Sequence, residues 1–189
     1  MSASRVSRTN EASTPESSGA SLLAPEFVYL GHGYVVANVG ALLTVVAFAQ
    51  PAAEVFRALQ GVMERVAVRE GTVGVHVFVD GGHGPPDEQA RGVLKQFLEQ
   101  LDSRCAGLAM CLGGDGFVAA ARRSIASLAV HGLRTRARVR IVGSNIDGAS
   151  WVLEQLGRHA PPGATGMDVA KLVDRIQRDM RSEALAAPG

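Results

Sequence analysis

The stretch of the chain that most constrains its fold is residues 72–102, in which a strand pattern is followed by a glycine-rich loop and then by a helix pattern. Over residues 73–79, valine occupies every second position, which places the valines on one face of a strand. The loop from Gly81 to Pro86 ends that alternation, and over residues 90–101 apolar residues recur at the three- and four-residue spacings of a helix. A strand that continues into a helix through a short loop is half of a crossover unit. The stretch therefore predicts an open sheet with helices packed on it.

Apolar segments on either side of this stretch predict the rest of the sheet. Residues 34–38 and 42–48 are apolar and β-branched, which predicts a hairpin with Gly40 in its turn. Residues 106–112 are apolar on both faces, as in a strand that is covered on both sides. Residues 137–142 alternate between arginine and apolar side chains, as in a strand with one face toward water. Together these patterns predict an α/β fold with a single mixed sheet of about five strands and amphipathic helices packed on it.

Proline, glycine and capping residues delimit the other helices. One helix is expected to begin near Pro51 and to end by Gly71, and another to begin near Phe117 and to end near Gly132. Two capping boxes predict where the last two helices begin. These boxes are formed by Ser144 with Asp147 and by Thr165 with Asp168.

The composition divides the chain into four parts. Residues 1–24 are rich in Ser, Thr and Ala and lack apolar periodicity, which predicts a disordered tail. Residues 27–157 contain the predicted sheet and its helices, residues 158–164 form a linker, and residues 165–185 form a C-terminal amphipathic helix. We expect the apolar stripe of this last helix to pack on the sheet, with a contact to a partner or to a second copy of the chain as the alternative.

The cysteines and the apolar runs bear on the compartment. Cys105 and Cys111 lie six positions apart in a predicted strand, so their α-carbons are ~20 Å apart, whereas a disulfide tolerates at most ~7 Å. Two reduced, buried thiols suit a reducing compartment. No apolar run approaches the ~20 residues that cross a bilayer, and the N-terminal residues lack the apolar core of a secretory signal. We therefore expect a cytoplasmic protein.

Four segments carry a resemblance to a known family: YVVANVGALLTVVAF, VGVHVFVD, GFVAAARRSI and RVRIVGSNIDGASWVLEQL. In their order and in the elements they predict, they resemble the STAS-like superfamily, the fold of bacterial anti-sigma factor antagonists, and more closely its SpoIIAA-like branch. The resemblance covers about residues 27–157. It implies a non-catalytic regulatory module of the bacterial cytoplasm that binds a protein partner.

One feature of that family is missing from this chain. In the phosphoswitch members, a serine follows the third strand at the start of the next helix, where helix-terminal amides can hold a phosphate. The corresponding segment here runs from Asp80 to Asp87, and no Ser or Thr occurs between Val73 and Asp102. The resemblance therefore implies a docking surface, formed by the loop and helix of residues 81–101, without the phosphoswitch.

The candidate partner-binding residues lie in this loop. They are Asp80, Gly81, Gly82, His83, Gly84 and Asp87. His83 with the two aspartates also suggests acid–base chemistry, but Asp80 ends a strand and Asp87 opens a helix, so both carboxylates already have structural roles. The histidines, at positions 32, 76, 83, 131 and 159, and the two cysteines show no metal-ligand spacing. We predict no catalytic residue, no metal and no cofactor.

A second glycine-rich segment, Gly113, Gly114, Asp115 and Gly116, lies between a predicted strand and a predicted helix. A similar GGDG string occurs in NAD kinases and diacylglycerol kinases, where glycines let the backbone approach a phosphate. This suggests a nucleotide-acting enzyme with an anion-binding turn. Phe117 occupies the position of the kinase-type threonine, so we favour a tight turn without that activity.

Arginines follow this segment over residues 122–140, and no Asp or Glu occurs from Gly116 to Ile146. Arg122, Arg123, Arg138 and Arg140 are therefore candidates for binding an anionic ligand or lipid surface. The net charge of only +1 and the lack of interleaved aromatic residues argue against nucleic acid as the partner. The interpretation that we favour is that the arginines from Arg134 to Arg140 protect an exposed edge strand from unwanted pairing.

Overall fold

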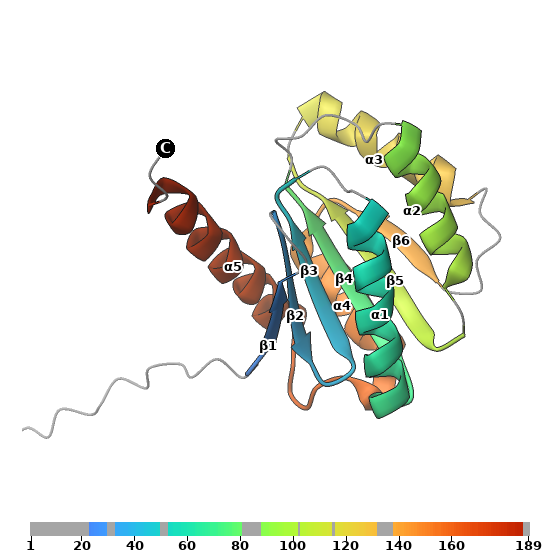
Figure 1. The fold of residues 1–189 in the computed structure, drawn as a ribbon, viewed down its shortest axis with the longest axis vertical. Helices are drawn as coiled ribbons and strands as arrows, with labels where there is room; N and C mark the ends of the chain where they lie inside the picture. Colours follow the sequence, from blue (N-terminus) through green and yellow to red (C-terminus); the bar gives the residue numbers. More distant parts are fainter. Residues whose placement is uncertain are drawn as a thin grey trace, which may run out of the picture.

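The computed structural model describes residues 23–29, 33–49, 53–80, 88–101, 103–114, 116–131 and 138–186. The strands are β1 (Glu26–Tyr29), β2 (Tyr34–Val39), β3 (Leu42–Ala47), β4 (Val73–Val79), β5 (Cys105–Leu112) and β6 (Val139–Val142). The helices are α1 (Ala53–Glu70), α2 (Glu88–Gln100), α3 (Gly116–His131), α4 (Asn145–Leu156) and α5 (Gly166–Ala186), with one turn of 3₁₀ helix at Gly157–His159. This is an α/β fold in which helices cover both faces of one sheet (Figure 1).

The described strands form a single mixed sheet whose spatial order, β1 to β6, is also their order in the chain. The first three strands are antiparallel, and β3 to β6 are parallel. Gly40 has a φ of 54° in the turn between β2 and β3, which confirms the predicted hairpin. The prediction of about five strands missed β1. This strand has only four residues at the edge of the sheet, too few for a periodic signal.

One face of the sheet, here called the α1/α2 face, carries a mainly aliphatic set of strand residues. Val36, Leu43, Val75 and Leu108 are buried there with side chains of α1 and α2. The aromatic rings of Phe56 in α1 and Phe97 in α2 lie with their centroids 5.5 Å apart. The predicted alternation of β4 is confirmed, because Val75 faces this side while Phe78 faces the other.

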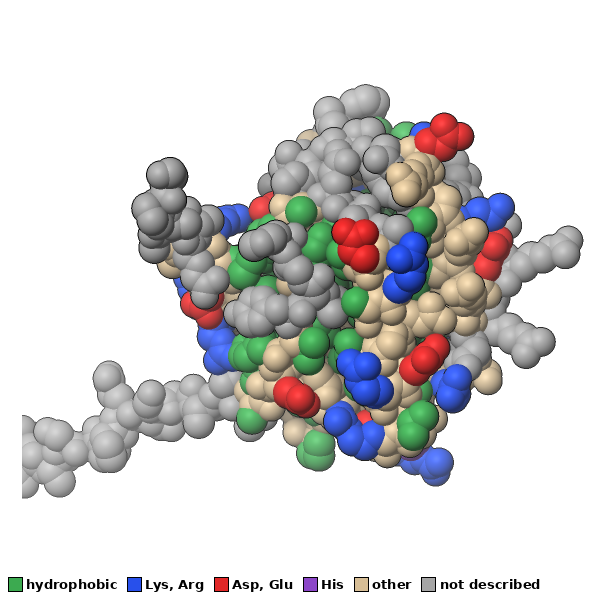
Figure 2. Space-filling model, in the orientation of Figure 1, with side chains coloured by type: hydrophobic (Ala, Val, Ile, Leu, Met, Phe, Trp, Pro, Cys, Tyr) green, Lys and Arg blue, Asp and Glu red, His purple; other side chains and the backbone are tan. Residues whose placement is uncertain are grey.

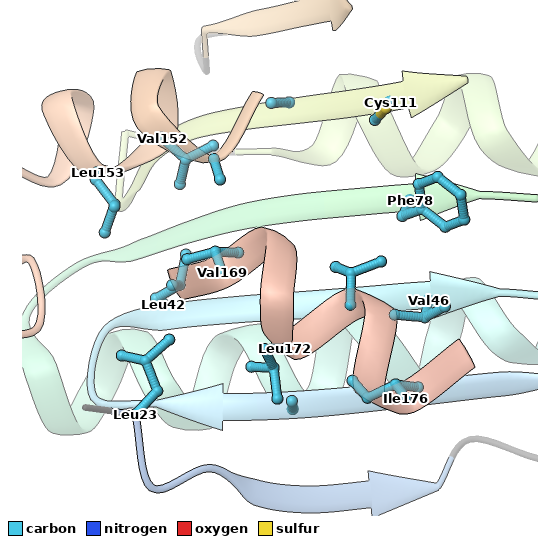
Figure 3. Packing of buried hydrophobic residues seen from close by; sticks show 14 of the residues in the cluster. Leu23, Leu42, Val46, Phe78, Cys111, Val152, Leu153, Val169, Leu172 and Ile176 are labelled. Carbon is cyan, nitrogen blue, oxygen red and sulfur yellow. The ribbon is translucent and has the colours of Figure 1, made fainter. Parts of the chain in front are cut away.

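The opposite face, here called the α4/α5 face, is covered by the last two helices. Leu42, Val46 and Phe78 point from the strands toward Val152 of α4 and Ile176 of α5 (Figure 3). The expectation that the C-terminal helix packs on the sheet is therefore confirmed. The predicted tail, residues 1–24, lies outside the described residues except at its end, where Leu23 is buried in this same cluster.

The predicted helix ends are also confirmed. Gly71, with a φ of 79°, follows the last residue of α1. Ser144 caps α4, because its Oγ accepts a hydrogen bond of 3.3 Å from the backbone N–H of Asp147. The cap of α5 is reciprocal. The backbone N–H of Asp168 donates to Thr165 Oγ1 at 3.3 Å, and the backbone N–H of Thr165 donates to Asp168 Oδ2 at 3.0 Å.

Helix α4 packs closely on the sheet where glycines lie between them. A Cβ atom on Gly74 of β4 would lie 2.7 Å from Val152 Cγ1, and a Cβ atom on Gly148 of α4 would lie 2.9 Å from Val142 Cγ2. Side-chain atoms do not normally approach a Cβ so closely, so both positions need glycine. Cys105 and Cys111 are buried and do not form a disulfide with each other, as predicted. Within the described part of the chain, no helix combines the length and apolar character needed to cross a membrane.

Candidate functional site

The carboxyl ends of the parallel strands β3 to β6 meet at one edge of the sheet, here called the carboxyl edge. The backbone N–H of Asp80, after β4, donates to Ala47 O of β3 at 2.9 Å, and the N–H of Gly113, after β5, donates to Val79 O at 3.1 Å. In open α/β sheets, ligands bind outside the carboxyl ends of the strands. The structure thus brings two of the sequence-predicted segments, the one after β4 and the one after β5, to this edge.

Asp80 is the described member of the predicted partner-binding loop. Its Oδ2 lies 3.6 Å from Nη2 of Arg181 in α5, in an ion pair whose side chains are 34% and 66% exposed respectively. The other predicted loop residues, Gly81, Gly82, His83, Gly84 and Asp87, lie outside the described residues. Sequence reasoning missed Arg181, because nothing in the sequence indicates that the end of α5 lies beside the end of β4.

Helix α2 begins directly after this loop and exposes a polar face. Phe97 and Leu98 are buried in the cluster of the α1/α2 face, which fixes the helix on the sheet. The side chains of Lys95 and Glu99 form an exposed pair one helical turn apart, at 3.9 Å. Charged side chains of both signs lie interspersed over the side of the molecule on which α1 lies (Figure 2). This side therefore carries no extended field of one sign.

The segment after β5 is a tight glycine turn at the carboxyl edge. Gly114 and Gly116 have φ values of 105° and 80°, a backbone conformation that favours glycine. Arg123 Nη1 donates to the backbone oxygens of Leu112 at 3.4 Å and Gly114 at 3.2 Å. This guanidinium thus holds the carbonyls of the turn. Asp115 lies outside the described residues, and binding of a phosphate or nucleotide at this turn stays a prediction.

Two other candidate arginines, Arg140 in the edge strand β6 and Arg138 just before it, contact α4. Arg138 Nη1 donates to Gln155 Oε1, and the guanidinium carbon of Arg140 lies 6.0 Å from the ring centroid of Trp151. The predicted edge position of this strand is confirmed, because β6 is the last strand of the sheet. The side chain of Arg122 lies outside the described part. The arginines therefore do not converge on one point. Arg123 holds the glycine turn, and Arg138 and Arg140 lie against α4.

An open groove of about 400 Å³ runs along the outer side of β6 and α4. Its lining residues are Arg140, Ile141, Val142, Gly143, Asp147, Ser150, Trp151 and Glu154. A smaller cavity of about 90 Å³ lies between α1 and α2 at the opposite ends of the strands, where Val73 and Cys105 line it. Sequence analysis did not predict the groove, because it depends on how α4 crosses the strand.

Beneath α4 lies a buried polar pair that sequence analysis did not single out. His76 of β4 is 0% exposed, and neither ring nitrogen has a hydrogen-bond partner among the described residues. Thr44 of β3 is its neighbour in the strand register, and Thr44 Oγ1 is likewise without a partner there. Burial lowers the pKa of His76 from 6.5 to about 4, so the imidazole is neutral at pH 7. His76 therefore lies in the core, against Gly148 of α4.

Cys111 of β5 lies on the same face of the sheet as His76 and is also uncharged. Burial raises the pKa of its thiol to about 11, against a smaller opposing effect of Arg123. Among the described residues, no group of three or more His, Cys, Asp or Glu side chains could hold a metal ion.

The chain matches no model of a known protein family, and no curated protein or solved structure is significantly similar to it.

Proposed function

We propose that this protein is a non-catalytic STAS-like interaction module of a bacterial cytoplasm, which binds a protein partner through the loop and helix of residues 81–101. The observation that carries the proposal is the position of α2. This helix follows β4 at the carboxyl edge, buries its apolar stripe in the core, and leaves a polar face of both charge signs exposed. A helix fixed in this way offers a partner a pre-formed surface beside a loop, which keeps the entropy lost on binding small.

Two further features support the proposal. The described sheet has an antiparallel hairpin leading into parallel strands with helical connections, as the resemblance to STAS-like proteins implies. The first residue of the loop segment, Asp80, is tied to the sheet through its backbone and to α5 through Arg181. The loop therefore starts from a fixed point. Mixed charges on the adjoining helix give selectivity for one partner more than raw affinity.

The proposal is tested by affinity capture with the full chain, identification of the captured protein, and titration of that purified protein. Replacing Asp80, His83 and Asp87 together by alanine is expected to weaken its binding by about tenfold or more, as the loss of hydrogen-bonded polar contacts does. The matched control changes two exposed carboxylates to alanine: Glu64 of α1, which lines the cavity at the opposite ends of the strands, and Asp174 of α5, on the other face of the sheet. Unchanged partner recovery by the triple variant would contradict the proposal.

We place binding of an anionic lipid or ligand by the arginines second. Arg123, Arg138 and Arg140 already contact backbone carbonyls, Gln155 and Trp151 respectively, so binding would have to replace or share those contacts. Salt-dependent sedimentation with acidic vesicles would support this second candidate.

A further inference from the structure

The edge strand β6 has backbone groups that no other described strand uses. Among the described strands its only partner is β5, in a parallel ladder in which the N–H of Leu108 donates to Arg138 O at 2.8 Å. In such a ladder, successive residues direct their backbone groups alternately to one neighbour and to the other. The N–H and C=O groups of Val139 and Ile141 therefore point away from β5, toward the open edge. An edge of this kind is a template for another strand.

The groove beside this edge carries charges of both signs. Arg140 lies on the strand side, and Asp147 and Glu154 lie on the helix side. A surface that binds an identical copy of itself across a two-fold axis must be complementary to itself, so it needs both signs in one patch. A strand of uniform charge from another protein would meet repulsion from one side of the groove. The groove therefore favours a second copy of this chain over a uniformly charged strand.

We propose that two copies of the chain associate through antiparallel pairing of β6 with β6, with Ile141 opposite Ile141 of the second copy on the two-fold axis. In this register the outward backbone groups of Ile141 pair directly, and the two sheets join into one. Arg140 then lies opposite Val142 of the second copy.

The charges select this register. Pairing Arg140 directly with its own copy would place like charges opposite each other, which is unfavourable. Opposite Val142, by contrast, the guanidinium meets the first turn of the other copy's α4, because Gly148 packs on Val142 within each copy. Asp147 precedes Gly148 in that turn and lines the groove. Two symmetric Arg140–Asp147 pairs result. The arginine that protects the edge from indiscriminate pairing thus permits this single arrangement.

The experiment is sedimentation equilibrium of the full chain, for which the expected mass is twice the 19.7 kDa of one copy. Arg140→Glu and Asp147→Arg are each expected to weaken the dimer roughly tenfold or more, because two attractive pairs become repulsive. The double variant Arg140→Glu with Asp147→Arg restores opposite charges and is expected to recover most of the wild-type affinity. Arg158→Glu, an equal charge change at an exposed residue of the 3₁₀ turn after α4, is the control and is expected to leave the dimer intact.

Amide hydrogen exchange provides a second measurement that does not depend on the variants. The amide of Ile141 is expected to exchange more slowly as the protein concentration rises, because pairing buries it. The proposal is overturned by a single-copy mass at every concentration reached, by a dimer that tolerates both single changes, or by a double variant no tighter than the single ones. A dimer whose Ile141 amide exchanges freely would overturn it as well, since the copies would then meet elsewhere.

Discussion

The two faces of the sheet hold their helices by different means. On the α1/α2 face, bulky aliphatic side chains such as Leu43 and Val75 fill the space between the strands and the helices. On the α4/α5 face, Gly74 takes a position where a Cβ atom would lie 2.7 Å from Val152 Cγ1, so side chains of α4 pack directly on the backbone of β4. The first kind of packing needs only apolar residues of about the right size. The second needs particular small residues.

The close approach of α4 also encloses polar groups. His76 is sealed beneath Gly148, whose Cβ position lies 3.3 Å from the imidazole Nε2, and Thr44 lies beside it in the strand register. Neither side chain has a hydrogen-bond partner among the described residues. On the α1/α2 face the buried polar side chain of Asn38, which pairs with Leu43 in the strand register, is hydrogen-bonded: it donates to Gly40 O at 2.9 Å and accepts from Arg69 at 2.8 Å. Truncating a buried side chain should therefore destabilise the two faces alike. Adding a methyl group or lowering the pH should affect them differently.

The first prediction, with the largest expected effect, concerns the shared property. Leu42 and Leu43 are adjacent in β3, are both 0% exposed, and face opposite sides of the sheet. Leu42→Ala and Leu43→Ala are each expected to lower the free energy of unfolding by about 2–5 kcal/mol, through lost burial and a residual cavity. Urea denaturation measures both. A cost below about 1 kcal/mol for Leu42→Ala alone would mean that α4 and α5 unfold separately from the rest.

The second prediction separates the faces by pH. His76 has a pKa of about 4 in the folded protein against 6.5 in the unfolded chain, so between these pH values only the unfolded chain takes up the proton. The contribution of the buried, neutral His76 to the free energy of unfolding is therefore at its full value above pH 6.5. It falls as the pH is lowered from 6.5 to 4. At ~1.36 kcal/mol for each pKa unit, the loss is about 3 kcal/mol.

Carboxylates titrate over part of the same range, so the measurement is the difference between the wild-type protein and His76→Leu. The variant is expected to lose this part of the pH dependence and to be at least as stable at pH 7, because an apolar side chain needs no hydrogen-bond partner there. His159→Asn, at an exposed position, is the matched control. Equal pH profiles for the wild-type protein and His76→Leu would show that the imidazole is not sealed from water.

Much of this architecture follows from the sequence because it depends on local periods. The alternation in β4, the hairpin at Gly40 and the cap at Thr165 each arise from residues close together in the chain, and each was predicted correctly. Strand β1 was missed because its four residues are too few to show a period. It is defined by its pairing with β2, such as Phe27 with Ala37, which is a contact between residues ten positions apart.

The candidate site was less predictable because it is built from residues distant in sequence. The position of Asp80 at the carboxyl edge follows from the strand pattern, but its ion pair with Arg181 depends on the path of α5. Similarly, Arg123 was predicted as a candidate for binding an anion, and its hydrogen bonds to the carbonyls of Leu112 and Gly114 were not foreseen. Glycine in a strand gave no sign of the close approach of α4, because glycine is also common in turns and bulges.

The last and smallest effect tests that close approach with two helix glycines. Gly148 in α4 and Gly61 in α1 are both helical, so replacement by alanine should stabilise each helix by about 0.5–1 kcal/mol through its higher helix propensity. At Gly61 the new methyl group would meet only Arg65 Nη1, at 3.7 Å, so Gly61→Ala is expected to keep that gain.

At Gly148 the same methyl group would lie 2.9 Å from Val142 Cγ2 and 3.2 Å from His76 Cδ2, both of which are held in the sheet. The helix must then move away from the strands, and overpacking of this kind costs about 1–3 kcal/mol, more than the propensity gain. Gly148→Ala is therefore expected to be less stable than the wild-type protein while Gly61→Ala is more stable, as thermal and urea unfolding would show. Because the two changes are chemically identical, the difference between them measures the packing of α4 alone, and equal stabilisation by both would mean that α4 rests on the sheet no more tightly than α1 does.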